Sequence, residues 1–102
     1  MAITINLDET NKFVMVSIVG RFDYSLHEEF KNVLDYTKSN SYVKYVIDLG
    51  QVDEIDSSAI GMILLLKDMA GGKQSNVELR HIRPTIKEEL EVAQIYKLVN
   101  VA

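Results

Sequence analysis

Hydrophobic and polar residues alternate near the N-terminus in the pattern of two strands that each bury one face. Every second residue is apolar in segment 3–7, and residues 13–19 form a second run rich in β-branched side chains. The intervening DETN, residues 8–11, is typical of a turn. We therefore predict two strands paired as a hairpin, with Gly20 ending the second strand.

Between Leu26 and Leu34 the apolar spacing changes to three and four residues, which predicts an amphipathic helix. Two signals compete for the start of this helix. Ser25 and Glu28 have the spacing of a capping box, and Asp23 is an alternative cap.

The segment SYVKYVIDLG, residues 41–50, is nearly continuous in apolar and β-forming residues, which indicates a strand buried on both faces. Because it follows a helix, we expect a central strand reached by a crossover. The polar QVDEID, residues 51–56, is predicted to be the loop that follows. Residues 58–70 then form a second helix, which Gly71 and Gly72 stop.

The rest of the chain continues the alternation of strand and helix. Residues 77–82 are predicted to be a strand, and Pro84 opens a third helix with Thr85 and Glu88 at capping-box spacing. This order predicts a single α/β domain over residues 1–102. Its sheet is expected to be mixed, mostly parallel and four- to five-stranded, with the helices packed on it.

The composition is that of an ordinary globular domain and excludes several function classes. The chain has 102 residues, of which 47% are apolar and 25% are charged, and its formal net charge is −4. Scattered cations and an acidic balance argue against nucleic acid as a partner. The chain contains no cysteine, which excludes disulfides, thiolate metal sites and cysteine nucleophiles.

The N-terminal MAITINLDETNK has neither the basic start nor the apolar stretch of a signal peptide. The longest uninterrupted apolar run, Met62 to Leu66, is far shorter than the roughly 20 residues of a membrane-spanning helix. We therefore expect a cytoplasmic protein that does not enter a membrane.

The segment EIDSSAIG, residues 54–61, places two serines between an acidic stretch and the most apolar run of the chain. Asp56, Ser57 and Ser58 are of the residue types that cap helices by accepting hydrogen bonds from free N–H groups. Phosphorylation and nucleophilic catalysis are the alternatives for the hydroxyls. A phosphate would add roughly −1.5 to −2 charges beside a helix N-terminus of about +0.5. We expect the fold to tolerate it and docking at the helix start to change.

The helix that these serines begin has more apolar residues than one face can hold. Its core-facing arc is predicted to comprise Ala59, Met62, Ile63, Leu66, Met69 and Ala70. Ile60 and Leu64 fall outside this arc, and Gly61 and Leu65 lie opposite it. The surplus predicts either burial under a neighbouring helix or a surface that binds a partner.

Catalysis and metal binding have little support in the sequence. A serine nucleophile needs a nearby base, and the two histidines, His27 and His81, fall in no catalytic motif. The Gly-x-Ser-x-Gly elbow is also absent. Carboxylates at positions 48, 53, 54 and 56 are most simply a solvated acidic loop rather than a Mg²⁺ site. We expect no enzymatic activity, no metal and no cofactor.

The segment VIDLGQVDEIDSSAIGMILLLKDM, residues 46–69, resembles the central motif of STAS domains of the bacterial anti-sigma factor antagonist type. That motif is an apolar strand ending in Asp-Leu, a short loop, and Asp-Ser-Ser opening an apolar helix. GRFDYSLHEEFKNVL, residues 20–34, is similar to the Gly-x-x-Asp segment and first helix of the family, and residues 83–101 are similar to its closing helix. The resemblance covers nearly the whole chain.

The resemblance implies a phosphorylation switch. By this resemblance, Ser57 would be phosphorylated by a partner anti-sigma factor that is itself an ATP-dependent serine kinase. A metal-dependent serine phosphatase would remove the phosphate. Unphosphorylated protein would bind the kinase. The implied partner-binding residues are Asp23, Asp56, Ser58, Ile60, Gly61 and Leu64.

Two positions depart from the family pattern. Ala59 stands where glycine is commoner after the serines, and Gln94 replaces part of an Ala-Gly-Leu-like turn. Neither change removes the phosphoacceptor. The alternative function is a constitutive STAS subunit, for example of a lipid-transport ATPase, in which the serines would act as helix caps.

Overall fold

The computed structural model describes residues 2–39 and 41–102. Its principal elements are β1 (Ile3–Asp8), β2 (Phe13–Phe22), α1 (His27–Asp35), β3 (Lys44–Ile55), α2 (Ser57–Met69), β4 (Val77–Arg80), α3 (Pro84–Val92) and β5 (Asn100–Val101). The five strands form one sheet in chain order, in which only the β1–β2 pair is antiparallel. The predicted α/β fold with a mixed, mostly parallel sheet is confirmed.

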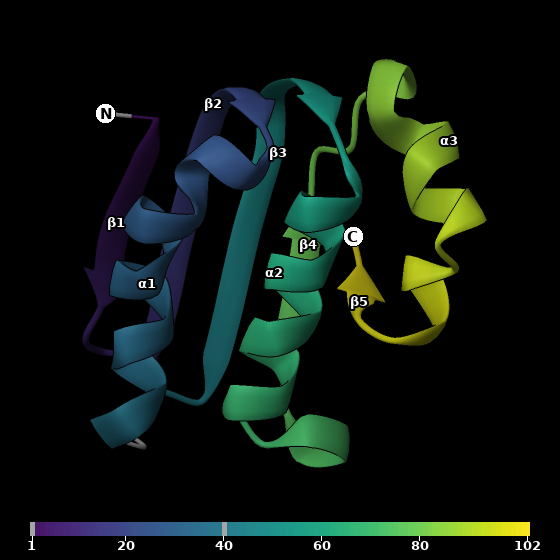
Figure 1. Ribbon diagram of the computed structural model, residues 1–102. Coiled ribbons are helices and arrows are strands. Elements are labelled where there is room, and N and C mark those ends of the chain that lie inside the picture. The colour runs from purple at the N-terminus through teal and green to yellow at the C-terminus, as the bar shows by residue number, and fades with distance from the viewer. Residues whose placement is uncertain (1, 40) are drawn as a thin grey trace.

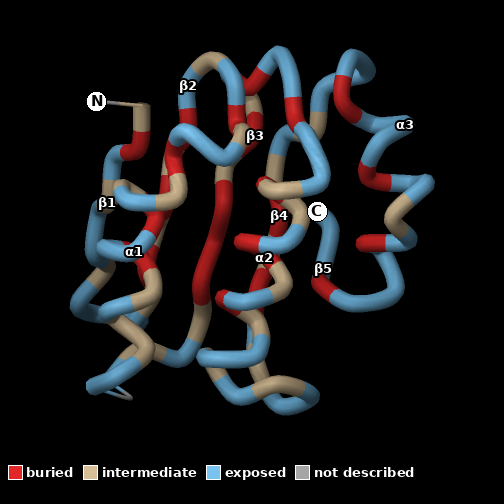
Figure 2. Tube along the Cα trace, viewed as in Figure 1, coloured by how far each residue is buried: buried red, intermediate tan, exposed pale blue. Residues whose placement is uncertain are grey.

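Helices α1 and α2 lie across one face of the sheet, and α3 flanks α2 near β4 and β5 (Figure 1). The core lies between this face and the helices. Figure 2 shows buried positions along β2 and β3 and on the helix sides that face them. Its largest fully buried side chains include Phe22, Phe30, Ile47, Ile63 and Leu90. Each crossover therefore contributes a helix whose apolar face packs against the strands.

The opposite face of the sheet is closed by its own side chains. Val46 is only 1% exposed although it lies outside the main core cluster. Glu78, the register partner of Val46 on β4, pairs with two cations. One of its carboxylate oxygens lies 2.9 Å from Lys44 Nζ, and the other contacts Arg80. The Lys44 ammonium lies 5.2 Å from the ring centroid of Phe13. β3 is thus buried on both faces, as predicted, with helices on one side and an ion-pair ladder on the other.

The strands β2 and β3 extend further than the sequence predicts. β2 passes through Gly20, whose φ of +87° lies at a register shift, and ends at Phe22. The predicted loop 51–56 is mostly strand, since β3 continues to Ile55. The prediction was wrong because exposed acidic residues there alternate with buried Val52 and Ile55, and Ile55 pairs with Phe22.

Helix starts differ from the predicted capping boxes. Asp23, not Ser25, caps the first turn by accepting the Ser25 N–H at 3.0 Å. A 3₁₀ turn over Tyr24–Leu26 precedes α1. The N-cap of α3 is Arg83 and makes no side-chain capping bond. The Thr85–Glu88 capping box is therefore wrong, because Pro84 begins the helix and places Thr85 inside it.

Several predicted positions shift by small amounts. β4 ends at Arg80 rather than at residue 82, because His81 has a positive φ of 59°. Met69 was assigned to the core but is the last residue of α2 and is exposed. Val43, expected in the central strand, precedes β3 and is 64% exposed.

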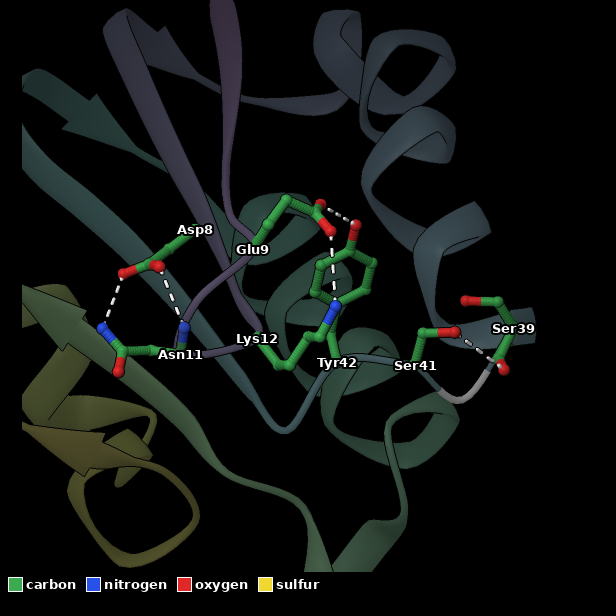
Figure 3. A network of polar contacts seen from close by, with 7 residues as sticks. All are labelled: Asp8, Glu9, Asn11, Lys12, Ser39, Ser41 and Tyr42. Atoms are coloured by element: carbon green, nitrogen blue, oxygen red, sulfur yellow. Dashed lines mark hydrogen bonds and ion pairs between the residues drawn. The ribbon is translucent and has the colours of Figure 1, made fainter.

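A polar network closes the end of the sheet at which β2 and β3 begin (Figure 3). Asp8 accepts hydrogen bonds from the backbone and the side chain of Asn11 at 3.0 and 2.9 Å. Glu9 accepts the Tyr42 hydroxyl at 2.7 Å and lies 3.4 Å from Lys12 Nζ. The Glu9–Tyr42 bond joins the β1–β2 turn to the segment that enters β3, and the other contacts hold the turn itself.

Within the described residues, no helix combines the length and apolarity required to span a membrane.

Candidate functional site

Ser57 lies at the junction between the central strand and the helix that follows it. β3 ends at Ile55, Asp56 is the N-cap, and Ser57 is the first residue of α2. The junction therefore lies at the carboxyl ends of the parallel strands, where open α/β sheets commonly bind their ligands. Ser57 is exposed and Ser58 is half-buried.

Asp56 alone performs the capping at this junction. Its Oδ1 accepts the Ala59 N–H at 3.0 Å, and its backbone N–H donates to the Phe22 carbonyl at 3.4 Å. Among residues 2–39 and 41–102, the hydroxyls of Ser57 and Ser58 make no hydrogen bond. Of the three predicted caps, Asp56 is therefore confirmed, and the capping role of Ser57 and Ser58 is wrong. An aspartate one residue earlier already satisfies the helix, which leaves both hydroxyls available.

The Gly-x-x-Asp segment meets the same junction from β2. Arg21 and Glu54 are register partners, and Arg21 Nε lies 2.9 Å from Glu54 Oε2 and 3.8 Å from Asp23 Oδ2. The hydrogen bonds from Ser25 lower the pKa of Asp23. Asp23 and Asp56 line one small pocket with Arg21 and Glu54. The structure thus brings together two predicted site residues that lie far apart in the sequence.

A larger groove opens between the start of α2 and the side of α3. We call it the α2–α3 groove; its volume is about 420 Å³, and its lining residues are Asp56, Ser57, Ile60, Glu88, Glu89, Val92 and Ala93. Val92 is 77% exposed. The apolar floor and the phosphoacceptor candidate therefore share one cavity.

Sequence analysis missed the contribution of α3 to this site. Glu88 was assigned only to a capping box with Thr85, and Glu89 and Val92 had no assigned role. Val92 itself could have indicated the site, because an apolar residue four positions after Glu88 lies on the same helix face as that carboxylate. Ser57 and α3 line one groove only because of how α3 packs, and no local sequence pattern indicates that packing.

The predicted partner-binding residues on α2 separate into two groups. Ile60 is half-buried and lines the groove. Gly61 is exposed, and a Cβ added there would meet nothing within 4 Å. Leu64 is half-buried against the core and lies outside the groove lining. Of the surplus apolar pair, Ile60 is therefore the residue that faces the candidate site.

The histidines are engaged elsewhere. The His27 ring stacks on Tyr24 at a centroid distance of 4.3 Å, and His81 Nδ1 lies 3.1 Å from Asp48 Oδ1. Neither lines the α2–α3 groove. The described part of the chain also holds no cluster of three or more histidine or acidic side chains arranged for a metal ion.

Comparison with known proteins identifies the family. Residues 5–100 match the family described as "Mlab, STAS domain". The chain belongs to the STAS family. A STAS-domain containing protein of Pseudomonas aeruginosa strain UCBPP-PA14 is 31% identical over 102 residues, which cover all of both chains.

Solved structures confirm the fold of this STAS domain. A putative anti-sigma factor antagonist from Thermotoga maritima matches with a TM-score of 0.83 at 17% identity, covering 97% of this chain and 84% of that one. The Bacillus cell fate determinant SpoIIAA in its phosphorylated form matches with a TM-score of 0.75 at 15% identity, covering 99% and 91%. The fold is therefore that of anti-sigma factor antagonists.

Proposed function

We propose that this STAS domain is a binding module switched by phosphorylation of Ser57. Unmodified protein docks on an anti-sigma factor of the serine kinase type, and the phosphorylated form does not. A metal-dependent serine phosphatase restores binding. One observation carries the proposal: Ser57 is exposed beside an apolar groove and its hydroxyl makes no hydrogen bond to the residues that the structure describes, while Asp56 caps the helix.

The position of the cap explains how modification leaves the fold intact. A phosphate on Ser57 adds roughly −1.5 to −2 charges, but it displaces no hydrogen bond that α2 needs, because the cap belongs to Asp56. The positive end of the helix dipole partly offsets the added charge. The energetic consequence therefore falls on docking rather than on folding.

Docking is weakened by three effects of the same phosphate. The phosphate narrows the entrance of the groove. A partner that covered the phosphate would also have to remove the water bound to it. A kinase that modifies Ser57 also holds nucleotide phosphates beside it, so the transferred phosphate repels the remaining nucleotide. A combined loss of about 1.4 kcal/mol weakens the complex tenfold.

The kinase and phosphatase activities come from partners in this proposal. Serine activation needs a base within hydrogen-bond reach, and both histidines of the chain are paired away from Ser57. The domain accordingly acts as substrate and ligand, without an enzymatic activity of its own. The likeness to SpoIIAA, of which a phosphorylated form has been solved, supports a phosphate on this fold.

The test is phosphorylation in a defined mixture. The protein is incubated with ATP and the serine kinase encoded nearest its gene, and intact mass and fragment mapping locate the product. We expect one phosphate at Ser57, none in Ser57→Ala, and a phosphate still located at Ser57 in the matched control Ser58→Ala. Ser57→Ala should bind the kinase permanently and Ser57→Asp weakly. Modification at another residue, or equal binding of the last two variants, would contradict the proposal.

A constitutive subunit of a lipid-transport ATPase is the second candidate. The apolar floor of the α2–α3 groove favours it, because a permanent interface needs such a surface and no phosphate. The serines would then lie in the interface rather than cap the helix. Protein purified from its own host distinguishes the candidates. A fraction carrying one phosphate supports the switch, whereas unmodified protein that always accompanies an ATPase supports the subunit.

A further inference from the structure

The two walls of the α2–α3 groove carry different chemistry. The α2 wall presents Ser57 and the half-buried Ile60. The α3 wall presents Val92 with two carboxylates, Glu88 and Glu89, one helical turn before it. Residues at i, i+3 and i, i+4 lie on one helix face, so this wall combines an exposed aliphatic side chain with adjacent negative charge.

The charge of the groove is unbalanced. Asp56 adds a third carboxylate to its rim, and no lysine or arginine is among its lining residues. Within the part of the chain that the structure describes, Glu88 and Glu89 take part in no ion pair. Complementary partners place positive groups against such a surface, which speeds association and selects among partners.

The α3 wall is held in place by the core. Ile86 and Leu90 of α3 are fully buried, and they hold the helix against the rest of the domain. Val92 is therefore fixed in position although it is 77% exposed. A surface that is ordered before binding loses less conformational freedom on docking than a flexible one. An exposed valine on an anchored helix is suited to a specific contact.

We propose that the α2–α3 groove binds a segment of the kinase that presents an aliphatic side chain flanked by lysine or arginine. The aliphatic group packs between Ile60 and Val92, and the cation pairs with Glu88 and Glu89. This inference rests on the proposed function and adds α3 as a second recognition element. Ser57 decides whether docking occurs, and α3 decides which kinase docks.

The experiment uses the Ser57→Ala form, which blocks turnover, and measures the Kd for the kinase by calorimetry at two salt concentrations. Glu88→Lys should raise the Kd at least tenfold at low salt, and the difference should shrink at high salt. The matched control is Glu91→Lys, which makes the same charge change on the same helix outside the groove lining. It should change the Kd less than threefold.

The apolar half of the contact is tested separately. Val92→Ser should raise the Kd at least fivefold at both salt concentrations. The matched control is Leu65→Ser, because Leu65 is 46% exposed on α2 and lies outside the groove lining. It should leave the Kd within twofold. Thermal unfolding of all four variants verifies that the fold is retained.

The outcomes separate the inference from the proposed function. If Ser57 is phosphorylated but the Glu88 and Glu91 variants bind alike, or Val92→Ser binds as its parent does, the inference fails and the switch stands. If the kinase binds with the expected dependence on α3 but leaves Ser57 unmodified, the inference stands and the switch fails. A kinase that neither binds nor modifies the chain overturns both.

Discussion

Asp8 and Glu9 are hydrogen-bonded to neighbouring residues where β2 and β3 begin, whereas Glu88 and Glu89 line an open groove near the ends of these strands. At the first end, hydrogen bonds from Asn11 lower the pKa of Asp8, and the Tyr42 hydroxyl lowers that of Glu9 (Figure 3). At the second end, Glu88 and Glu89 face the groove without an ion-pair partner among the described residues.

The difference indicates which end of the sheet is suited to binding. A carboxylate that is already hydrogen-bonded within its own loop gains little from another molecule, and its bonds hold the loop in place. Carboxylates beside an exposed valine and a free hydroxyl gain most from an external cation. The end where β2 and β3 begin, which we call the closed end, therefore supports the fold. The end with the α2–α3 groove, which we call the open end, is the candidate recognition surface.

The largest expected effect comes from removing the anchor of the open end. Leu90 is fully buried and fastens α3, so Leu90→Ala should lower the free energy of unfolding by about 2–5 kcal/mol. Val92→Ala, two residues away, should change it by less than about 0.5 kcal/mol, because Val92 is exposed. Urea unfolding followed by circular dichroism measures both. Equal losses would show that Val92 belongs to the core and not to a binding surface.

A smaller effect is expected at the start of α2. Asp56→Ala should cost about 1 kcal/mol of stability through loss of the cap, and Ser58→Ala should cost only a few tenths. The same unfolding measurement compares them, with Ser57→Ala as a second low-cost variant. If either serine variant lost as much stability as Asp56→Ala, the serine hydroxyls would be caps, which would contradict the view that they are free.

The smallest effect on stability at neutral pH is expected from removing the Glu9–Tyr42 hydrogen bond where β2 and β3 begin. A spectroscopic titration of Tyr42 tests this bond more directly than unfolding does. The hydrogen bond to Glu9 raises the pKa of Tyr42 to about 12, from an ordinary value of 10.0. The folded pKa is the higher one, so the stability that this bond contributes is complete below pH 10 and is lost as the pH rises towards 12.

Ultraviolet titration of the phenols should therefore show a late component that disappears in Tyr42→Phe. Glu9→Gln should move this component back towards pH 10, since the carboxylate is the main cause of the shift. Tyr45 provides an internal control, because burial rather than Glu9 raises its pKa. A component near pH 12 that survives Glu9→Gln but is absent from Tyr42→Phe would show that the raised pKa of Tyr42 does not depend on this bond.

The strand and helix pattern was predictable where local spacing is strong. Alternation in residues 3–7, the apolar run around Val46 and the helical spacing after Asp56 all correspond to elements of the structure. Errors appeared where several local signals competed. Asp23 and Asp56 were among the predicted caps and do cap the helices, whereas the competing serines do not, because the end of the preceding strand brings these carboxylates to the free N–H groups.

The length of β3 illustrates a different kind of error. Its acidic end had the composition of a loop, but pairing of Ile55 with Phe22 and burial of Val52 keep it in the sheet. Pairing joins segments that are far apart in the chain, so local composition does not report it. The same applies to Asp23 and Asp56, whose shared pocket depends on the β2–β3 register.

By itself the sequence determined the family, the order of the elements and the position of two serines at a helix start, because these depend on residue type and short-range spacing. Only the tertiary structure decided that Asp56 caps α2, so that both hydroxyls lack a hydrogen bond among the described residues, and that Val92 and Glu88 share a groove with Ser57. The physical reason is packing: burial of Ile86 and Leu90 fixes α3 beside α2, and that placement creates the groove.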